Sequence, residues 1–147
     1  MSEVEDALAE LLGEQDRTMW LLTVSAAGQA VTLRQNHAVT GTATLTGAAT
    51  QFTNTLGTTA VLTTTGATTL TATGQTLDVS GSVTGAALTT SAAATNLGTL
   101  SVGSANLTAT GALTQSGVLT DAGALTVSAA GQAITLTQNN AVTGTAT

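Results

Sequence analysis

The sequence predicts an all-β protein, a parallel β-helix (β-solenoid) of about six turns that follows a short N-terminal helix. Three observations lead to this prediction: an internal repeat, short segments that alternate apolar and polar residues between glycines, and a composition rich in threonine and small apolar residues. Strand-forming repeats are typical of solenoids, because each unit buries its apolar face only by stacking on its neighbours.

The repeat is visible at two lengths. Residues 22–44 and 125–147 are nearly identical, and they differ only at Val31/Ile134, Arg34/Thr137 and His37/Asn140. Within this long unit a Leu-Thr pair recurs, beginning at Leu22, Leu45, Leu70, Leu88, Leu107 and Leu125. The long unit therefore predicts five turns. Its first two intervals are the longest, and they predict small protrusions near residues 34–41 and 51–59.

Alternation with a period of two residues assigns the faces of each strand. The leucine and the third residue of each motif should point inward, and the second and fourth should point outward. The second residue is threonine in six successive turns, which predicts a ladder of hydroxyls on one flat face. This candidate surface ladder comprises Thr23, Thr46, Thr71, Thr89, Thr108 and Thr126. Glycines such as Gly28, Gly74 and Gly81 should turn the corners, where a positive φ favours glycine.

Two regions are predicted, residues 1–20 and residues 21–147. The first is acidic, and its Ser2 and Glu5 fit a capping box at the start of a helix. We expect this helix to cap the open end of the solenoid, with a partner-binding helix as the alternative. Trp20, at the junction, is predicted to pack on the core or seal the first turn, with a sugar-stacking platform as the less favoured role.

Composition excludes several function classes. The formal net charge is −6 and the chain has no lysine, so a nucleic-acid partner is not expected. No apolar stretch reaches the roughly 20 residues of a membrane span, and no signal peptide begins the sequence. Cysteine is absent, so neither disulfides nor thiolate metal sites are expected.

Few side chains are suited to catalysis, so we expect a protein that is not an enzyme. The solenoid region holds Asp78, Asp121, Arg34 and His37 as its ionisable side chains. The two aspartates are predicted to be solvated turn residues, because no third group supports an acid–base pair. His37 is the only histidine, and its counterpart in the repeat is Asn140, so a polar corner role is favoured over metal binding. No catalytic, metal or cofactor-binding residue and no cofactor is predicted.

The stretch NLGTLSVGSANLTATGALTQSGVLTDAGALTVSAAGQ (96–132) and the unit LTVSAAGQAITLTQNNAVTGTAT resemble the repeats of filamentous haemagglutinin-type large exoproteins, adhesins secreted by the two-partner route. This resemblance implies a right-handed solenoid, a secreted or cell-surface location and a structural or adhesive shaft. It also implies a host surface or glycan as the partner. The sequence departs from the family in lacking a signal peptide and a secretion domain and in stopping within a repeat, which suggests a fragment.

Two further expectations come from the strands themselves. An outward Thr-x-Thr ladder is also what an ice- or surface-binding solenoid presents, and this is the alternative function. The last turn ends without a polar cap, and an uncovered strand edge favours pairing with another chain. End-to-end self-association through the C-terminal edge is therefore predicted.

Overall fold

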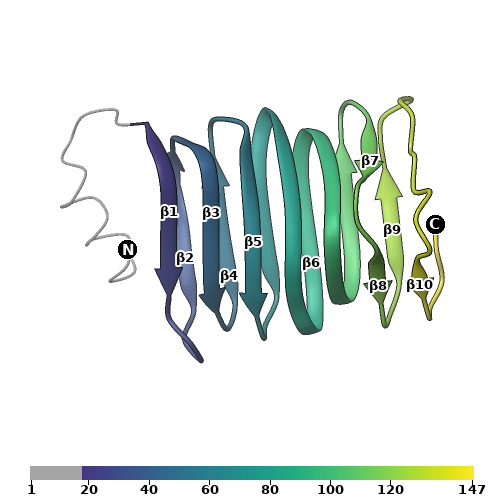
Figure 1. The fold of residues 1–147 in the computed structure, drawn as a ribbon, viewed down its shortest axis with the longest axis horizontal. Helices are drawn as coiled ribbons and strands as arrows, with labels where there is room; N and C mark the ends of the chain where they lie inside the picture. Colours follow the sequence, from purple (N-terminus) through teal and green to yellow (C-terminus); the bar gives the residue numbers. More distant parts are fainter. Residues whose placement is uncertain (1–17) are drawn as a thin grey trace.

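The computed structural model describes residues 18–147 as a stack of parallel β-coils along one axis (Figure 1). The strands are β1 (Met19–Ser25), β2 (Val31–His37), β3 (Val39–Gly47), β4 (Thr50–Asn54), β5 (Thr58–Thr64), β6 (Thr68–Ala109), β7 (Leu113–Gln115), β8 (Leu119–Asp121), β9 (Leu125–Ser128) and β10 (Ala141–Val142). Residues 18–147 contain no helix, and every strand pairing among them is parallel. The predicted β-solenoid is confirmed, with about seven turns.

The predicted N-terminal helix falls, up to residue 17, outside the residues that the structure describes. Met19 and Trp20 belong to β1, so the solenoid begins at residue 19, slightly earlier than predicted. β1 pairs with β3, which pairs with β5, while β2 pairs with β4, and both series continue into the long strand β6. The N-terminal coils therefore have two main faces, which we call the β1–β3–β5 face and the β2–β4 face.

Strand pairing gives the length of each coil directly. Leu22 pairs with Ala43, and Thr42 pairs with Thr59. Both coils are shorter than the first two intervals between Leu-Thr pairs, so those intervals do not measure coils. Leu45 lies beside Leu62, in a coil that the Leu-Thr count passed over, and Leu70 lies on the other face beside Phe52.

Only one of the two predicted protrusions is found. Three residues separate Leu33 from His37, whereas their partners Phe52 and Asn54 are separated by one residue, so β2 bulges at residues 34–36. The protrusion expected near residues 51–59 is wrong, because the coil that joins Thr42 to Thr59 is among the shortest in the stack.

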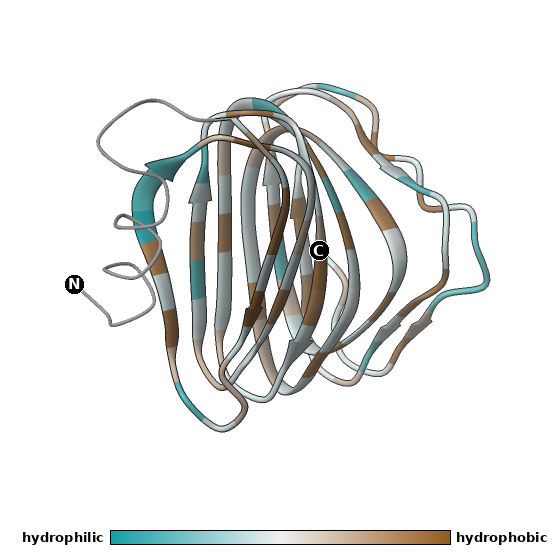
Figure 2. Cartoon of the chain, turned by 60° about the vertical axis from the view of Figure 1, so that its left-hand side comes forward, coloured by the Kyte–Doolittle hydropathy of each residue, from teal (hydrophilic) through white to brown (hydrophobic). Residues whose placement is uncertain are grey.

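The core consists of columns of apolar side chains that repeat from coil to coil. Leu33, Phe52 and Leu70 form one such column, and all three are buried. Figure 2 shows hydrophobic residues recurring along every coil, separated by more polar ones. Because each inward leucine contacts its equivalents above and below, the small side chains of this sequence fill a narrow core without large aromatic residues.

Glycine permits the tightest approach between coils. Gly28, Gly74 and Gly131 have the positive φ expected of corner residues, whereas Gly81 has a positive φ within the segment that pairs with β5. At Gly81 (φ 107°) an added Cβ would lie 2.1 Å from the Leu62 carbonyl oxygen, so only glycine fits there.

Candidate functional site

The six threonines of the predicted ladder point outward, but they do not form one column. Thr23 pairs with Thr44 and Thr46 pairs with Thr63 on the β1–β3–β5 face, whereas Thr71 pairs with Thr53 on the other face. Thr108 lies beside Ser128, and Thr126 lies beside Asn106. The prediction of a single ladder is wrong, because the Leu-Thr pair occurs on more than one face of a coil.

A different polar surface crosses the coils of the β1–β3–β5 face. Its central column contains Thr42, Thr59 and Asp78 in register, and Asn96 and Thr114 in register further along. Two adjoining hollows follow this surface and share Thr59 and Asp78. We call their combined extent the Asp78 groove.

The larger hollow has a volume of about 260 Å³. It is lined by Thr59, Asp78, Val79, Ser80, Asn96, Gly98 and Ser116. Its floor is low at Gly98, where an added Cβ would come within 3.0 Å of the Ser80 Cβ. The smaller hollow continues toward β1 and is lined by Thr40, Gly57, Thr58, Thr59, Thr76 and Asp78.

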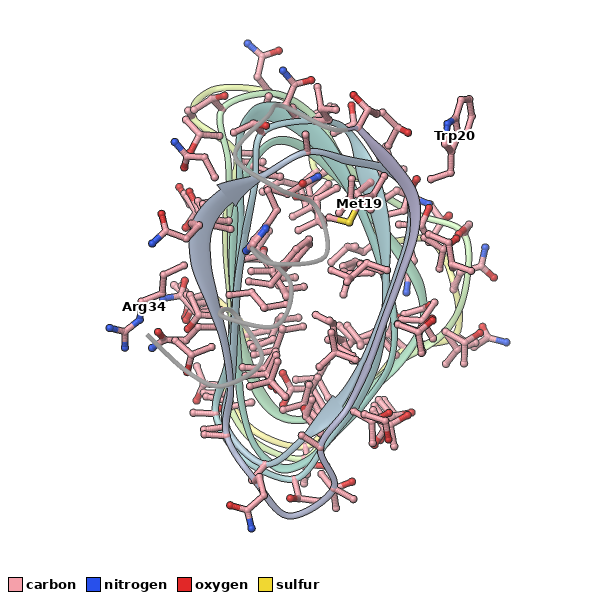
Figure 3. All side chains as sticks on the ribbon, turned by 90° about the vertical axis from the view of Figure 1, so that its left-hand side faces the viewer. Met19, Trp20 and Arg34 are labelled. Atoms are coloured by element: carbon pink, nitrogen blue, oxygen red, sulfur yellow. The ribbon has the colours of Figure 1, made fainter. Side chains whose placement is uncertain are left out.

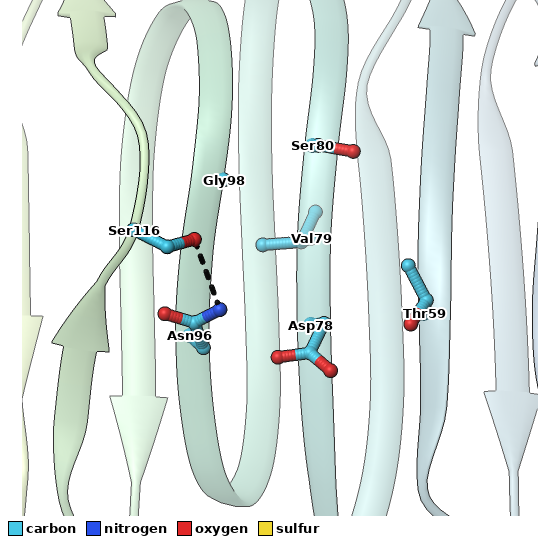
Figure 4. A pocket seen from close by; sticks show the side chains of 7 residues that line it. All are labelled: Thr59, Asp78, Val79, Ser80, Asn96, Gly98 and Ser116. Carbon is cyan, nitrogen blue, oxygen red and sulfur yellow. Dashed lines mark hydrogen bonds between the residues drawn. The ribbon is translucent and has the colours of Figure 1, made fainter.

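Hydrogen bonds hold one polar side chain of the groove in place and leave another available. Asn96 Nδ2 donates to Ser116 Oγ at 3.2 Å, and Thr114 Oγ1 donates to Asn96 Oδ1 at 3.4 Å. Figure 4 shows the half-buried Asp78 carboxylate between the side chains of Asn96 and Thr59. Within residues 18–147 no hydrogen bond or ion pair engages this carboxylate, so its oxygens are free to accept hydrogen bonds.

Trp20 lies at the β1 end of the same face. Its side chain is 81% exposed and projects from the solenoid, whereas that of Met19 points inward (Figure 3). The expected packing of Trp20 on the core is therefore wrong. Its carbonyl group abuts Gly41, and Thr40 Oγ1 donates to the Met19 carbonyl at 3.3 Å, so the backbone of Trp20 lies beside the Thr40 end of the groove.

The other ionisable side chains lie away from the groove. Arg34 projects from the opposite face of the solenoid, where its Nε donates to Gln51 Oε1 at 2.5 Å (Figure 3). The His37 ring is buried and stacks on Phe52 with ring centroids 6.2 Å apart. Asp121 is completely buried, which contradicts its prediction as a solvated turn residue.

Asp121 occupies an inward position between two valines. It pairs with Val102 on one side and Val142 on the other, and Oδ1 accepts a hydrogen bond from the Gly123 N–H at 2.9 Å. It therefore contributes to a corner of the core, and it does not join Asp78 in an acid–base pair. The part of the chain that the structure describes holds no group of three metal-ligating side chains.

The sequence alone does not single out Ser80, Asn96 or Ser116 as residues of a binding surface. The signal available was the equal spacing from Asp78 to Asn96 and from Asn96 to Thr114. That spacing matches one coil, but it predicts a shared column only once the coil length is known.

Residues 84–147 match a family described as repeats of unknown function (DUF5649). No curated protein and no solved structure matches the chain. Among residues 18–147, no helix has the length and apolar character needed to cross a membrane. The chain is thus a β-solenoid repeat protein.

Proposed function

We propose that the chain is a non-enzymatic structural and adhesive β-solenoid, a segment of the shaft of a bacterial surface exoprotein. The observation that carries this proposal is the continuous parallel stack of coils, whose outer surface consists largely of small, uncharged polar residues. Such a stack is a rigid spacer, because each coil is held by backbone hydrogen bonds and core contacts to the coils beside it.

The placement of the ionisable groups supports a role without catalysis. Asp78 and Arg34 lie on opposite faces, and both His37 and Asp121 are buried. General acid–base chemistry requires two such groups within reach of one reacting bond. The resemblance to filamentous haemagglutinin-type repeats adds the proposal of a secreted or cell-surface location.

Protease treatment of intact cells tests this proposal. An antibody against residues 18–147 should detect the protein on unpermeabilised cells that produce it, and external protease should remove the signal. A cytoplasmic protein serves as the control and should survive the same treatment. Detection only after the cells are opened would contradict the surface location.

The alternative is an ice- or surface-binding solenoid, and one observation favours it. Threonines pair directly across coils at Thr42 with Thr59, and at Thr46 with Thr63. The array is interrupted by Val61 and is followed by the charged Asp78, which disturbs a regular lattice of hydroxyls and methyls. Thermal hysteresis of the purified protein, lost on Thr59→Leu substitution, would support this alternative, and its absence would exclude it.

A further inference from the structure

The exposed indole of Trp20 and the Asp78 groove lie on the same face of the solenoid. Together they span six coils, from β1 to the coil of Ser116, which corresponds to five spacings of about 4.8 Å or roughly 24 Å. The polar column begins at Thr42, because its neighbour in β1 is Leu21. The groove is thus long and narrow, and its axis is parallel to the axis of the solenoid.

The groups along this surface differ in the contacts that they offer. Trp20 presents a flat apolar ring system, exposed at one end. Asp78 offers a carboxylate without a partner among the described residues, and charge-assisted hydrogen bonds to a carboxylate are stronger than neutral ones. Asn96, already fixed by Ser116 and Thr114, provides a planar amide with both donor and acceptor atoms.

This combination fits a neutral sugar chain better than an acidic polymer. The axial C–H groups of an equatorially substituted sugar ring pack on an indole, and its hydroxyls both donate and accept hydrogen bonds. The coil spacing is close to the length that one hexose occupies in an extended β-linked chain. No positively charged side chain lines the groove, which disfavours sulfated or otherwise acidic polymers.

We propose that the surface formed by Trp20, Asp78 and Asn96 binds a neutral, β-linked oligosaccharide that lies along the groove. This inference deepens the adhesive part of the proposed function by naming the ligand class and the residues that contact it. Trp20 stacks on one sugar ring, and Asp78 and Asn96 accept and donate hydrogen bonds to hydroxyls of rings further along.

Trp20 is the only tryptophan of the chain, so its fluorescence reports on the site directly. The probes are β-1,4-linked oligomers of glucose, xylose and N-acetylglucosamine, each from one to six units. Before addition, the emission should be that of a solvent-exposed indole. At least one series should then shift or quench it, with an affinity that rises up to about five units and then levels off. Buried-type emission of the free protein would overturn the inference.

Substitutions separate specific binding from other effects. Asp78→Ala and, by calorimetry, Trp20→Ala should each weaken binding of the responsive oligomer by roughly tenfold. Asn96→Ala should also weaken binding. Its matched control is Asn106→Ala, which should not, because Asn106 is exposed and lies beside Thr126, outside the groove. Circular dichroism of each variant confirms that it is folded.

Three further results would overturn the inference: no response to any of the three series, equal affinity of the Asp78→Ala variant, or binding that disappears when a chelator removes divalent cations. None of these results bears on the structural shaft, which is tested by location on the cell. Conversely, a cytoplasmic location would leave the oligosaccharide titration unaffected, so the two proposals fail separately.

Discussion

Asn54 connects two parts of one corner through a single buried side chain. The Val39 N–H donates to its Oδ1 at 2.8 Å, and its Nδ2 donates to the carbonyls of Val39 at 2.8 Å and Leu56 at 2.7 Å. The residue is 1% exposed, so water does not replace these bonds when the amide is removed. A buried backbone group left without a partner costs about 1–3 kcal/mol.

Asn54→Ala should therefore lower the free energy of unfolding by about 3 kcal/mol. The matched control Asn106→Ala removes an exposed amide and should change it by less than about 0.5 kcal/mol. Urea denaturation followed by circular dichroism measures both values. Equal stability of the two variants would show that the corner does not depend on the Asn54 bonds.

Threonines that point inward differ in whether their hydroxyls have partners. Within residues 18–147, the buried Oγ1 atoms of Thr50, Thr90 and Thr95 make no hydrogen bond. Thr64 and Thr68 instead share a hydrogen bond at 2.8 Å. Thr50, Thr90 and Thr95 therefore bury a hydroxyl group without a hydrogen bond to offset the loss of water.

Thr90→Val should raise the free energy of unfolding by about 1 kcal/mol, because valine has the same shape and no polar atom to desolvate. Thr64→Val should lower the free energy of unfolding by about 1 kcal/mol, because the Thr68 hydroxyl then loses its hydrogen bond to Thr64. Chemical denaturation of the pair tests the difference in sign. A loss of stability in the Thr90→Val variant would indicate a partner for its hydroxyl.

Asp121 is a buried carboxylate whose Oδ2 atom makes no hydrogen bond within the described part of the chain. Its column partners Val102 and Val142 are valines. Asp121→Val should complete an apolar column and raise the free energy of unfolding by about 1 kcal/mol at pH 7, net of the lost bond to Gly123. Asp78→Val, on the surface, is the control and should change stability little. A destabilised Asp121→Val variant would contradict this account.

At the scale of the element, the coil is the unit of structure. Thr58 pairs with Leu77, so residues 58–76 form one complete coil. Deleting them joins Gly57 to Leu77 and should leave a folded solenoid that is shorter by about 4.8 Å. Deleting residues 58–66 removes about half a coil and should prevent folding, because strands then meet the wrong face.

Circular dichroism and small-angle X-ray scattering distinguish the two deletions. The full-coil deletion should keep the β-sheet spectrum and shorten the longest dimension, whereas the half-coil deletion should lose cooperative unfolding. If both variants unfold with equal cooperativity, the coils do not act as defined repeating units.

The sequence predicted the coils better than it predicted the surface. Alternation correctly placed Val24, Ala72 and Thr90 inside, because burial has a period of two residues in any strand. It did not predict which outward residues share a column, since this depends on coil length and on the bulge at residues 34–36. The exposure of Trp20 was not predicted either, because a large aromatic side chain is usually expected to be buried in the core.

At the scale of the whole molecule, the first and last coils carry almost the same sequence. If the last coil of one molecule stacked on the first coil of another, equivalent residues of the two repeats (22–44 and 125–147) would face each other. Leu125 would then lie against Leu22, and Leu136 against Leu33. In the described part of the chain, the outer edges of β1 and β2 pair with no other strand. Unpaired edges of this kind favour association between copies.

The polypeptide should therefore associate end to end as its concentration rises, which sedimentation velocity measures. Thr137→Lys places a charge on the last coil and should reduce this association. Thr69→Lys, on an exposed position in the middle of the stack, is the matched control and should have little effect. A strictly monomeric protein at high concentration would contradict the prediction.

The parallel stacking of coils also determines how the molecule responds to tension. Backbone hydrogen bonds between coils run along the axis, so a pull on the two ends loads the coils in series. The weakest coil then gives way first, and it releases about 65 Å of extended chain before the next one unfolds. A solenoid built in this way lengthens in steps and limits the peak force on whatever is attached to its ends.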